Sequence, residues 1–511
     1  MIVVLDFGSQ TVHLIARRIK DLGAKAEIMR YNASLEEIKA LKPDGIILSG
    51  GPAAITAKDA IMPDVRIFDL KLPMLGICYG EQMIAAHYGG KLAKRGEQNE
   101  YGKEKIKVAK GSELFAGLAE SEQVWMSHGD AVSALPEGFD ATASTPKCQV
   151  AAFEDRAKKL YGVQFHPEVV HTTNGSKMLS NFVFGACKAN KDYSLQGLDR
   201  RLIDEVKKEA GGDGVLIAVS GGVDSLVAAA LLNKAVPKQL YCVFIDTGLM
   251  RKGEVEETRE FFRKAGFFHF EVVDASQVFI GGLAGVTDPE QKRKIIGHAF
   301  IEVFEKKARE LGKKANIKFL AQGTIYPDRI ESAQASQAAE KIKSHHNLTL
   351  PEKMDLKVIE PLKDLYKDEV RELGEMLGLP HSRVWRQPFP GPGLAIRILG
   401  EVTVERLEIV READAVYREE IAKARLDGKI WQYFAALLPV KSVGVKADQR
   451  TYEYIIALRG VTSKDGMTAD WAKIPPQVMQ KISTRICNDV RGVNRVLYDV
   501  SSKPPATIEY E

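Results

Sequence analysis

The sequence predicts an α/β protein with two domains built on parallel sheets, followed by a smaller α+β domain. Three observations lead to this fold class. Short β-forming runs alternate with helical stretches through most of the chain, which is typical of parallel sheets. The Pro/Gly-dense stretch QPFPGPG at residues 387–393 ends that alternation. The length of 511 residues leaves room for roughly three domains of ordinary size.

The first predicted domain covers residues 1–190. Strands are expected in IVVLD, DGIILSG and PMLGI, with helices at residues 11–22 and 81–88 between and after them. This order favours a largely parallel sheet. The polar segment CKANKDYSLQG, residues 187–197, is expected to be a linker.

The second domain is expected at residues 195–386 and the third at 387–511. Strands of the second are expected at VLIAV, LYCVFID and KFLAQG. QPFPGPG cannot form a helix and hinders strand pairing, so it marks the boundary. The third domain is expected to contain a helix at 404–426, strands at PVKSVGV and YEYIIAL, a further helix and an irregular tail.

Composition and charge argue against several classes of protein. Apolar residues make up 45% and charged residues 27%, as in ordinary globular proteins. The net charge is only +4 and no basic tract is visible, so we expect no nucleic-acid partner. No apolar run reaches the ~18 residues of a membrane span, and the N-terminal apolar run is too short for a signal peptide. Five cysteines without a C-x-x-C pair argue against a disulfide framework and a zinc site, and we expect a cytoplasmic protein.

The stretch VLIAVSGGVDSLVAAALL places a Gly-rich turn between a strand and a helix. Such a turn gathers backbone N–H groups around one point and binds anions. No Lys follows the glycines, although a Walker loop needs one to transfer a γ-phosphoryl group. The loop therefore suits a diphosphate that leaves as a unit, whereas a turn that merely caps the helix is the plainer alternative. The candidate ATP-binding residues are Ser220, Gly221, Gly222, Val223, Asp224 and Ser225, with Asp224 also expected to hold Mg²⁺.

The next strand ends in Asp246-Thr247-Gly248, at the sheet edge where α/β proteins bind ligands. We expect these residues near a ribose or a base. SGGVDS at a strand end resembles the signature of the ATP pyrophosphatase (PP-loop) family. The resemblance implies that ATP is a substrate, that an acceptor oxygen becomes adenylated and that pyrophosphate departs.

A candidate nucleophile lies in PMLGICYGEQMIAAHYGG, where Cys78 stands in G-x-C-x-G between a strand and a helix. This is the pattern of a nucleophile elbow, and Gly76 and Gly80 permit its sharp turn. A helix N-terminus and an imidazole lower the pKa of a thiol from ~8.5. A lone Cys in an α/β core is usually structural, but the flanking glycines favour catalysis. The remaining cysteines are expected to be packing residues: Cys148, Cys187, Cys242 and Cys487.

The imidazole candidate is His166 in LYGVQFHPEV. Glu168 lies two positions on, hence on the same side of an extended chain, and can orient the ring as the acid of a triad does. Backbone N–H groups of Gly51 and Tyr79 are candidates for an oxyanion hole.

At Gly51, Cys78, His166 and Glu168 this half resembles the class I glutamine amidotransferases. The resemblance implies that Cys78 attacks the glutamine amide, forms a thioester and releases ammonia. Water then frees glutamate.

Four further positions follow from the same resemblance. Gln82 and the SHGD segment, with His128 and Asp130, are expected to contact glutamine. Glu81 stands where the family has an apolar residue, and we expect it to face outward.

Five segments spread over the rest of the chain closely resemble the glutamine-hydrolysing GMP synthase family: AQGTIYPDRIES, KIKSHHN, IEPLKDLYKDEVRELG, PFPGPGLAIR and KPPATIEYE. The resemblance implies a carbon–nitrogen ligase that adenylates xanthosine 5′-monophosphate (XMP) on its C2 oxygen and aminates it to GMP. It identifies residues 1–190 as the amidotransferase domain, 195–386 as the PP-loop domain and 387–511 as a dimerisation and XMP-binding domain, and it implies a homodimer.

The expected XMP contacts are carried over from this resemblance. Arg and Lys suit a phosphate, and a carboxylate accepts from purine N–H groups. A solvated surface charge is the plain alternative for each charged residue. The residues concerned are Arg293, Arg495, Lys503, Ile508 and Glu509.

Two other features belong to the same resemblance. Lys343, His345 and His346 fall in a segment like the family's mobile lid over ATP. Adjacent histidines can also bind a metal, but phosphate-facing cations are favoured. Tyr510 replaces the commoner Trp and keeps an aromatic ring there.

Two rival functions stay open on the sequence. Another PP-loop amidotransferase, such as one that makes NAD or asparagine, explains SGGVDS but not the C-terminal tail. A non-catalytic nucleotide-binding protein on the same scaffold would tolerate the loss of Cys78, His166, Glu168 or Asp224, yet all four are present.

Overall fold

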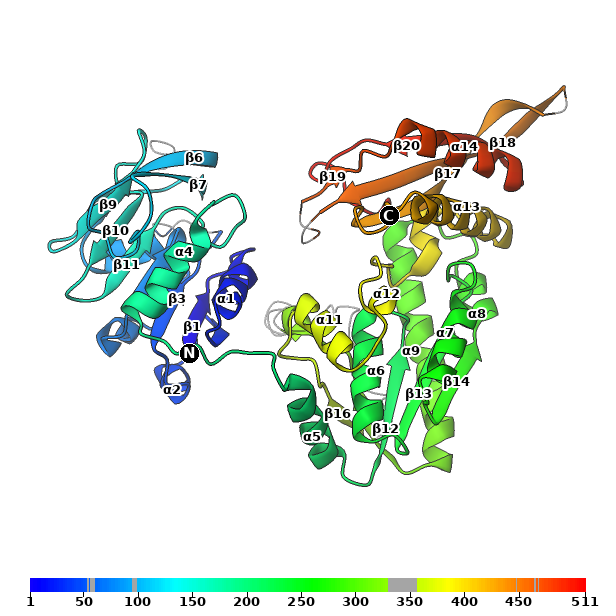
Figure 1. The fold of residues 1–511 in the computed structure, drawn as a ribbon, viewed down its shortest axis with the longest axis horizontal. Coiled ribbons are helices and arrows are strands. Elements are labelled where there is room, and N and C mark those ends of the chain that lie inside the picture. The colour runs from blue at the N-terminus through cyan, green and yellow to red at the C-terminus, as the bar shows by residue number, and fades with distance from the viewer. Residues whose placement is uncertain are drawn as a thin grey trace. The chain divides into compact units, whose positions relative to one another are not determined.

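The computed structural model describes residues 1–52, 55, 60–93, 99–329, 356–446, 448–463, 466 and 468–511. The chain forms two compact units, Met1–Ser194 and Leu195–Glu511. In the described residues, no helix combines the length and the apolar character that crossing a membrane requires. Each unit has its own sheet and core (Figure 1).

The first unit is built on a nine-stranded sheet in the order β2-β1-β3-β4-β11-β10-β9-β6-β7. Strands β2 to β11 along this order are parallel, as expected, and the other four are joined antiparallel. The antiparallel part was not predicted, although a strand such as β6 alternates exposed residues with buried or half-buried ones, which is typical of antiparallel strands. The strands are β1 (Ile2–Asp6), β2 (Ala26–Arg30), β3 (Gly45–Leu48), β4 (Met74–Ile77), β6 (Glu100–Val108), β7 (Ser121–His128), β9 (Asp140–Ser144), β10 (Ala152–Asp155) and β11 (Leu160–Val163).

The helices of this unit pack on the parallel part of the sheet. Helix α3 is buried along almost its whole length against β3, β4 and β11. Helix α1 contacts β1, β2 and α4. A small sheet of β5 (Lys91–Leu92) and β8 (Val132–Ala134) completes the unit. The helical segments are α1 (Val12–Asp21), α2 (Leu35–Ala40), η1 (Val65–Leu70), α3 (Tyr79–His87), α4 (Gly175–Ser180) and η2 (Asn181–Ala186).

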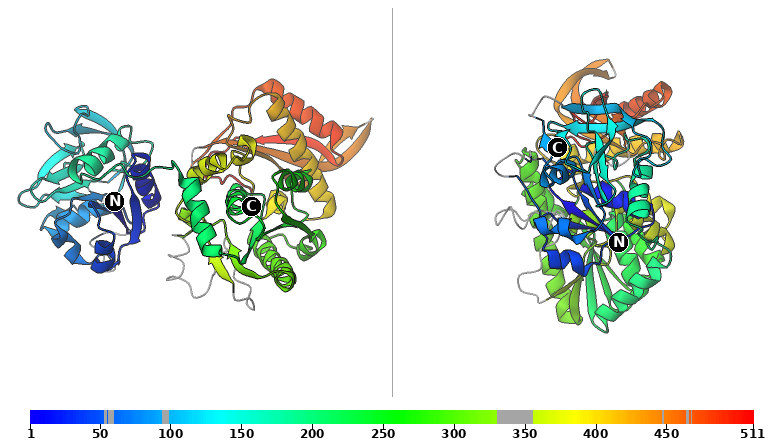
Figure 2. Two further views of the ribbon diagram at one scale, coloured as in Figure 1. Left: turned by 60° about the horizontal axis from the view of Figure 1, so that its bottom comes forward. Right: turned by 90° about the vertical axis from the view of Figure 1, so that its left-hand side faces the viewer.

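The second unit begins with a five-stranded parallel sheet in the order β14-β13-β12-β15-β16. Its central strand β12 is buried because both of its faces are covered by helices, as Figure 2 shows. The strands are β12 (Gly214–Val219), β13 (Leu240–Asp246), β14 (His269–Asp274), β15 (Ile317–Ala321) and β16 (Lys357–Ile359). The helices are α5 (Leu198–Ala210), α6 (Val223–Ala235), α7 (Glu254–Lys264), α8 (Ser276–Gly282), α9 (Pro289–Lys314), α11 (Lys367–Met376) and α12 (His381–Val384).

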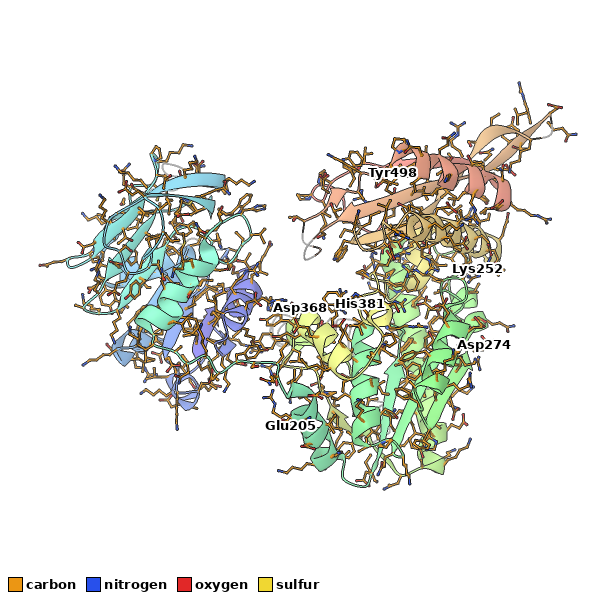
Figure 3. The ribbon with its side chains drawn as sticks, viewed as in Figure 1. Glu205, Lys252, Asp274, Asp368, His381 and Tyr498 are labelled. Carbon is orange, nitrogen blue, oxygen red and sulfur yellow. The ribbon has the colours of Figure 1, made fainter. Side chains whose placement is uncertain are left out.

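The C-terminal part of this unit is α+β, as expected. The long strands β17 and β18 form an antiparallel hairpin, β19 extends it, and β20 pairs parallel with β18. Tyr498 on β20 (labelled in Figure 3) donates its hydroxyl hydrogen to the carbonyl oxygen of Ala472. The elements are η3 (Gly393–Arg397), α13 (Val404–Lys423), β17 (Gln432–Lys446), β18 (Gln449–Thr462), β19 (Asp470–Trp471), α14 (Pro476–Asp489) and β20 (Val493–Asp499).

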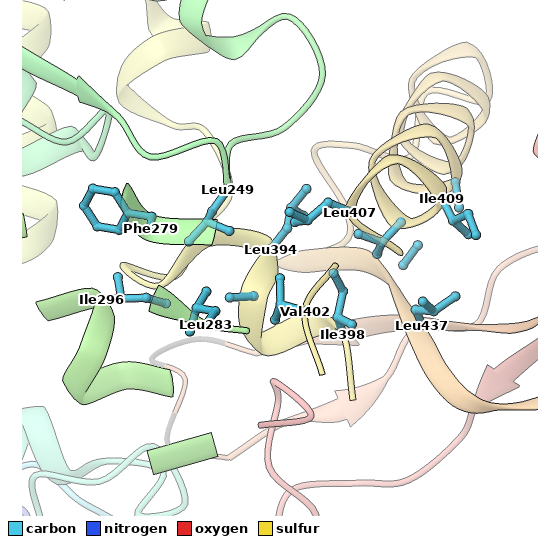
Figure 4. Packing of buried hydrophobic residues seen from close by; sticks show 14 of the residues in the cluster. Leu249, Phe279, Leu283, Ile296, Leu394, Ile398, Val402, Leu407, Ile409 and Leu437 are labelled. Carbon is cyan, nitrogen blue, oxygen red and sulfur yellow. The ribbon is translucent and has the colours of Figure 1, made fainter. Parts of the chain in front are cut away.

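One continuous apolar core joins the two parts of the second unit. Leu249, Phe279 and Leu283 from the parallel-sheet part lie in the same cluster as Leu394 and Leu437 from the C-terminal part (Figure 4). The segment QPFPGPG leads into this core, since the short helix η3 that follows is buried throughout. The C-terminal part is therefore held to the parallel sheet by apolar packing.

Candidate active sites

The turn from β4 to α3 places Cys78 in a backbone conformation that residues other than glycine rarely adopt. Its φ is 54° and its ψ is −105°. The Cys78 N–H donates to the carbonyl oxygen of Val163 at 2.7 Å, which ties the turn to β11. Such a conformation costs free energy and persists only where the surroundings hold it. The geometry is that of the predicted nucleophile elbow.

Two glycines allow this elbow, because helix and strand approach closely. A Cβ atom at Gly80 would lie 2.3 Å from the carbonyl oxygen of Leu48, and one at Gly76 would lie 2.4 Å from the carbonyl oxygen of Gly80. Neither distance is compatible with a side chain. The N-terminus of α3 is thus pressed against the ends of β3 and β4, next to the thiol.

His166 faces this elbow from the segment after β11. Its Nδ1 lies 2.7 Å from Glu168 Oε1, so the ring donates this hydrogen to the carboxylate. Glu168 is buried and also accepts from the hydroxyl of Thr11 at 2.6 Å. Burial alone would lower the pKa of His166, but the Glu168 carboxylate and the hydrogen bond with Cys78 outweigh it and raise that pKa well above its usual value. The structure therefore brings together the three residues predicted as a triad.

The expected oxyanion residues are also neighbours. A Cβ atom at Gly51 would lie 3.2 Å from the ring of Tyr79, and one at Gly50 would lie 3.3 Å from the ring carbon Cε1 of His166. The end of β3 thus lies against both the elbow and the imidazole.

Gln82 lies at the start of α3, and its expected contact with glutamine stays a prediction. It is buried, and its amide nitrogen donates to the carbonyl oxygen of Asp130 at 2.8 Å. His128 Nδ1 donates to the same oxygen at 3.0 Å. Gln82 therefore holds the SHGD segment beside Cys78, whose thiol lies 3.8 Å from the carbonyl oxygen of Ser127.

The expectation that Glu81 faces outward is wrong. Its side chain is fully buried and lies over Gly162 of β11, where a Cβ atom would come within 2.7 Å of Glu81 Cγ. The reason is that α3 is covered on nearly all sides, so this helix has no solvent face at that position. Within the described part of the chain, Glu81 Oε1 has no hydrogen-bond partner. Burial, and then the charge of Cys78, raise the pKa of Glu81 well above its usual value.

The Gly-rich loop follows β12 in the middle of the parallel sheet of the second unit. Gly221 has a φ of +75°, and Gly222 is the N-cap of α6. Ser220 and Ser225 lie with their hydroxyl oxygens 3.2 Å apart across the loop. The loop therefore has the strand–turn–helix form expected of an anion cradle, with hydroxyl groups at its rim.

The strand order places this loop at a topological switch point. Strand β12 pairs with β13 on one side and with β15 on the other, so the chain winds in opposite directions from it. Ligands of open α/β sheets bind at such points. Asp246 ends the neighbouring strand β13, where its carboxylate accepts from the Gly248 N–H at 2.9 Å and shapes the turn.

Asp224 lies in the first turn of α6, and the two oxygens of its carboxylate have different surroundings. Oδ2 accepts from the ammonium group of Lys367, whereas Oδ1 is buried and has no hydrogen-bond partner among the described residues. A single carboxylate with an available oxygen beside a phosphate site fits the way in which proteins hold Mg²⁺. The residues present therefore fit the expected metal.

A cavity of about 1390 Å³ opens beside this loop. Arg386 lines it and donates to the carbonyl oxygen of Gly221 at 2.9 Å. Arg251 also lines it and is almost completely buried, and burial lowers its pKa to about 10. Neither arginine was singled out from the sequence.

The residues expected to contact XMP lie on separate elements of the second unit. Arg293, near the start of α9, pairs with Glu290 at 3.5 Å. Arg495, on β20, donates to the hydroxyl of Ser442 at 3.3 Å. Lys503 donates to the carbonyl oxygen of Gly466 at 2.8 Å. The lid residues Lys343, His345 and His346 lie outside the described residues.

The tail is anchored by two buried cations that the sequence reasoning missed. Arg397 is fully buried and binds both carboxylate oxygens of Glu509, at 3.1 and 2.9 Å, and its guanidinium lies 4.1 Å from the ring centre of Phe434. Lys292 is buried and pairs with Glu511. The sequence signal for such an anchor was the charge of Arg397 inside the apolar run GLAIR, because a buried charge requires a partner of opposite charge.

Comparison with known proteins gives family matches to both ends of the chain. Residues 3–186 match the family model of glutamine amidotransferase class-I, and residues 419–510 match that of the GMP synthase C terminal domain.

Full-length relatives are also found. Proteins named GMP synthase [glutamine-hydrolyzing] from Bacillus cereus (strain B4264) and Bacillus anthracis are each 53% identical to this chain over 513 aligned residues. The alignment covers 100% of this chain and 99% of the Bacillus cereus protein. A protein of the same name from Bacillus cytotoxicus aligns with the same identity and coverage.

Proposed function

Because the chain belongs to the glutamine-hydrolysing GMP synthase family, we propose that it aminates XMP to GMP with nitrogen taken from glutamine. ATP is converted to AMP and pyrophosphate in the same reaction. The observation that carries the proposal is the Cys78 elbow beside the buried His166–Glu168 pair, in one chain with a lysine-free phosphate loop. The full-length relatives disfavour an amidotransferase that makes NAD or asparagine.

The first unit is proposed to release ammonia. Cys78 gives its proton to His166 and attacks the glutamine side-chain carbonyl carbon. The raised pKa of His166 favours this imidazolium–thiolate pair. His166 then returns the proton to the departing ammonia, and water attacks the thioester to free glutamate. The oxyanion is proposed to be bound by backbone N–H groups of Gly51 and Tyr79.

The second unit is proposed to activate XMP. The loop of residues 220–225 holds the phosphates of ATP, and the C2 oxygen of XMP attacks the α-phosphorus so that pyrophosphate leaves. Asp224 is the residue proposed to hold Mg²⁺, which supplies charge neutralisation for the leaving diphosphate when bound. The absence of a Walker lysine agrees with departure of a diphosphate.

XMP itself is proposed to bind near the C-terminal tail. Lys503 is proposed to reach its phosphate, with Arg293 and Arg495 as further cationic contacts, and the segment with Ile508 and Glu509 is proposed to lie by the purine. The pair between Glu509 and the buried Arg397 supports a tail that is ordered enough to shape a site.

A homodimer is proposed from the C-terminal sheet. Val443 and Val445 on β17 lie two residues apart and so share a face, and Tyr452 on β18 pairs opposite Val443. Their exposed fractions are 52%, 69% and 62%. An exposed apolar group of this kind is typical of a protein–protein interface.

A cytoplasmic location is proposed on two grounds. The substrates ATP, XMP and glutamine are metabolites of the cytoplasm. All five cysteines are free, which agrees with a reducing compartment.

The test of the proposed function uses Cys78→Ser with either nitrogen donor. We expect glutamine-dependent GMP formation to fall by at least ~10³-fold, because a serine hydroxyl is a far weaker nucleophile than a thiolate. Ammonium-dependent GMP formation should stay within about twofold of wild type. Cys187→Ala, at another buried thiol of the first unit, serves as the matched control and should retain both activities. Equal loss with both donors would rule out the assigned role of Cys78.

A further inference from the structure

Three chemically compatible side chains meet in the interior of the first unit, apart from the triad. Glu100 opens β6 and His128 ends β7, and the two stand directly opposite each other in the antiparallel register. Cys148 joins them from the loop between β9 and β10. Their potential ligand atoms all lie within 4.8 Å of one another. All three residues are buried, with exposed fractions of 3%, 4% and 0%.

Two atoms of this Glu100–His128–Cys148 cluster lack a hydrogen-bond partner. They are Glu100 Oε2 and His128 Nε2, which lie 3.5 Å apart and find no partner among the residues that the structure describes. His128 donates its Nδ1 hydrogen to the carbonyl oxygen of Asp130, so in the neutral ring Nε2 carries a lone pair. A lone pair facing a carboxylate oxygen in a dry interior requires a cation, or a proton, between them.

The hydroxyl group of Thr145 contacts both the Glu100 carboxylate and the backbone of Cys148. Thr145 donates its hydroxyl hydrogen to Glu100 Oε1 at 2.7 Å and accepts the backbone N–H of Cys148 at 2.8 Å. Glu100 and His128 are therefore each oriented by a second contact, and the Cys148 thiol donates to the carbonyl oxygen of Val150 at 3.2 Å. Metal ligands in proteins are typically oriented in this way.

We propose that the Glu100–His128–Cys148 cluster is a structural zinc site. A carboxylate, a thiolate and a neutral imidazole are ordinary zinc ligands, and a thiolate favours zinc over Mg²⁺ or Ca²⁺. The two anionic ligands cancel the 2+ charge, so the buried site is neutral. On binding, the Cys148 S–H bond is replaced by an S–Zn bond and the proton is released to solvent.

Zinc binding requires the three ligand atoms to move slightly closer together. Bonds of about 2.0 to 2.3 Å place tetrahedral ligand atoms roughly 3.3 to 3.8 Å apart, so the widest separation must shrink by about 1 Å. No C-x-x-C spacing marks the site, because its ligands come from separate strands and a loop; for this reason the cysteine pattern pointed away from zinc.

Cobalt(II) is the probe for the test, because it replaces zinc and is visible when bound to a thiolate. The full-length protein is produced in minimal medium with Co²⁺, so that the metal is present as the chain folds. We expect about one Co²⁺ per chain and a near-ultraviolet sulfur-to-cobalt absorption band. In Cys148→Ala, we expect the band to vanish and the cobalt content to fall at least tenfold.

Matched variants identify the thiol concerned. Cys187→Ala, at a buried cysteine without such neighbours, should keep the band and the cobalt, and so should Cys78→Ser. Circular dichroism and glutaminase activity establish whether Cys148→Ala is folded; Cys148→Ser, which keeps the size of the side chain, replaces it if it is not. Wild type without the band, or a band that disappears with Cys78 and not with Cys148, would overturn the proposal and leave a shared proton between Glu100 and His128.

Discussion

At the scale of single residues, Cys78 and Glu81 lie one helical turn apart in very different surroundings. Cys78 is held in a left-handed conformation at the end of a strand, where its thiol meets the imidazole of His166. Glu81, one turn on, is a carboxyl group enclosed without a cation. Burial of an unpaired carboxylate is costly, so the group keeps its proton to a higher pH than usual.

The first prediction concerns the stability of the first unit in Glu81→Gln. The native chain retains a proton on Glu81 that the unfolded chain gives up above a pH of about 4.5. Wild type therefore loses stability as the pH rises from there through the raised pKa, at up to about 1.4 kcal/mol per pH unit from this group. The glutamine side chain cannot ionise, so the variant escapes this loss.

Calorimetry between about pH 5 and pH 7 checks the prediction. The melting temperature of Glu81→Gln minus that of wild type should grow with pH, by roughly 2–4 °C for each kcal/mol. Taking the difference between the two proteins removes the groups that titrate alike in both. A difference that does not change with pH would contradict the buried, protonated state of Glu81.

At the scale of elements, the sequence correctly predicted the features that depend on local residue patterns and on the close packing of a helix against a strand. The elbow at Cys78 and the loop at Gly221 both follow from glycines placed between a strand and a helix, and the structure has both. The antiparallel strands of the first sheet were missed because pairing direction is set by distant segments. Arg397 and Lys292 were missed because their partners, Glu509 and Glu511, lie more than a hundred residues along the chain.

The C-terminal tail is anchored by buried ion pairs and is proposed to bind XMP, and one substitution and one deletion separate these two roles. Lys503→Gln removes a cation proposed to meet the XMP phosphate. Loss of a hydrogen bond to a charged group costs about 1.5–3 kcal/mol, so the KM for XMP should rise roughly 10–150-fold with stability nearly unchanged. Lys481→Gln, the same change at an exposed site on α14, is the control.

Deleting residues 508–511 should act differently. It leaves Arg397 and Lys292 as buried cations without their carboxylates, at a cost of about 3–5 kcal/mol for a broken buried pair. The truncated protein should lose GMP formation with both nitrogen donors and melt earlier in the second unit, while glutaminase activity persists. An unchanged KM and kcat for XMP in both variants would show that the tail is an ordinary chain end.

At the scale of the whole molecule, the chain forms two compact units, and we propose that the C-terminal sheet of the second unit carries the dimer interface. Val445→Asp places a charge on the most exposed of the three apolar residues of that surface. We expect wild type to sediment at twice 56.4 kDa and the variant to shift toward the monomer. Val170→Asp, at an exposed valine of the first unit, should remain dimeric. A Val445→Asp protein as dimeric as wild type would place the interface elsewhere.

We propose that ammonia released from glutamine in one unit replaces the C2 oxygen of XMP, which is activated in the other unit. The most direct test is one turnover mixture with ATP, Mg²⁺, amide-¹⁵N glutamine and XMP labelled with ¹⁸O at C2, analysed by mass spectrometry. The account predicts ¹⁵N in GMP and ¹⁸O in AMP, with pyrophosphate unlabelled, since the oxygen leaves attached to the α-phosphorus. Unlabelled AMP, or ¹⁸O found in inorganic phosphate with formation of ADP, would contradict it.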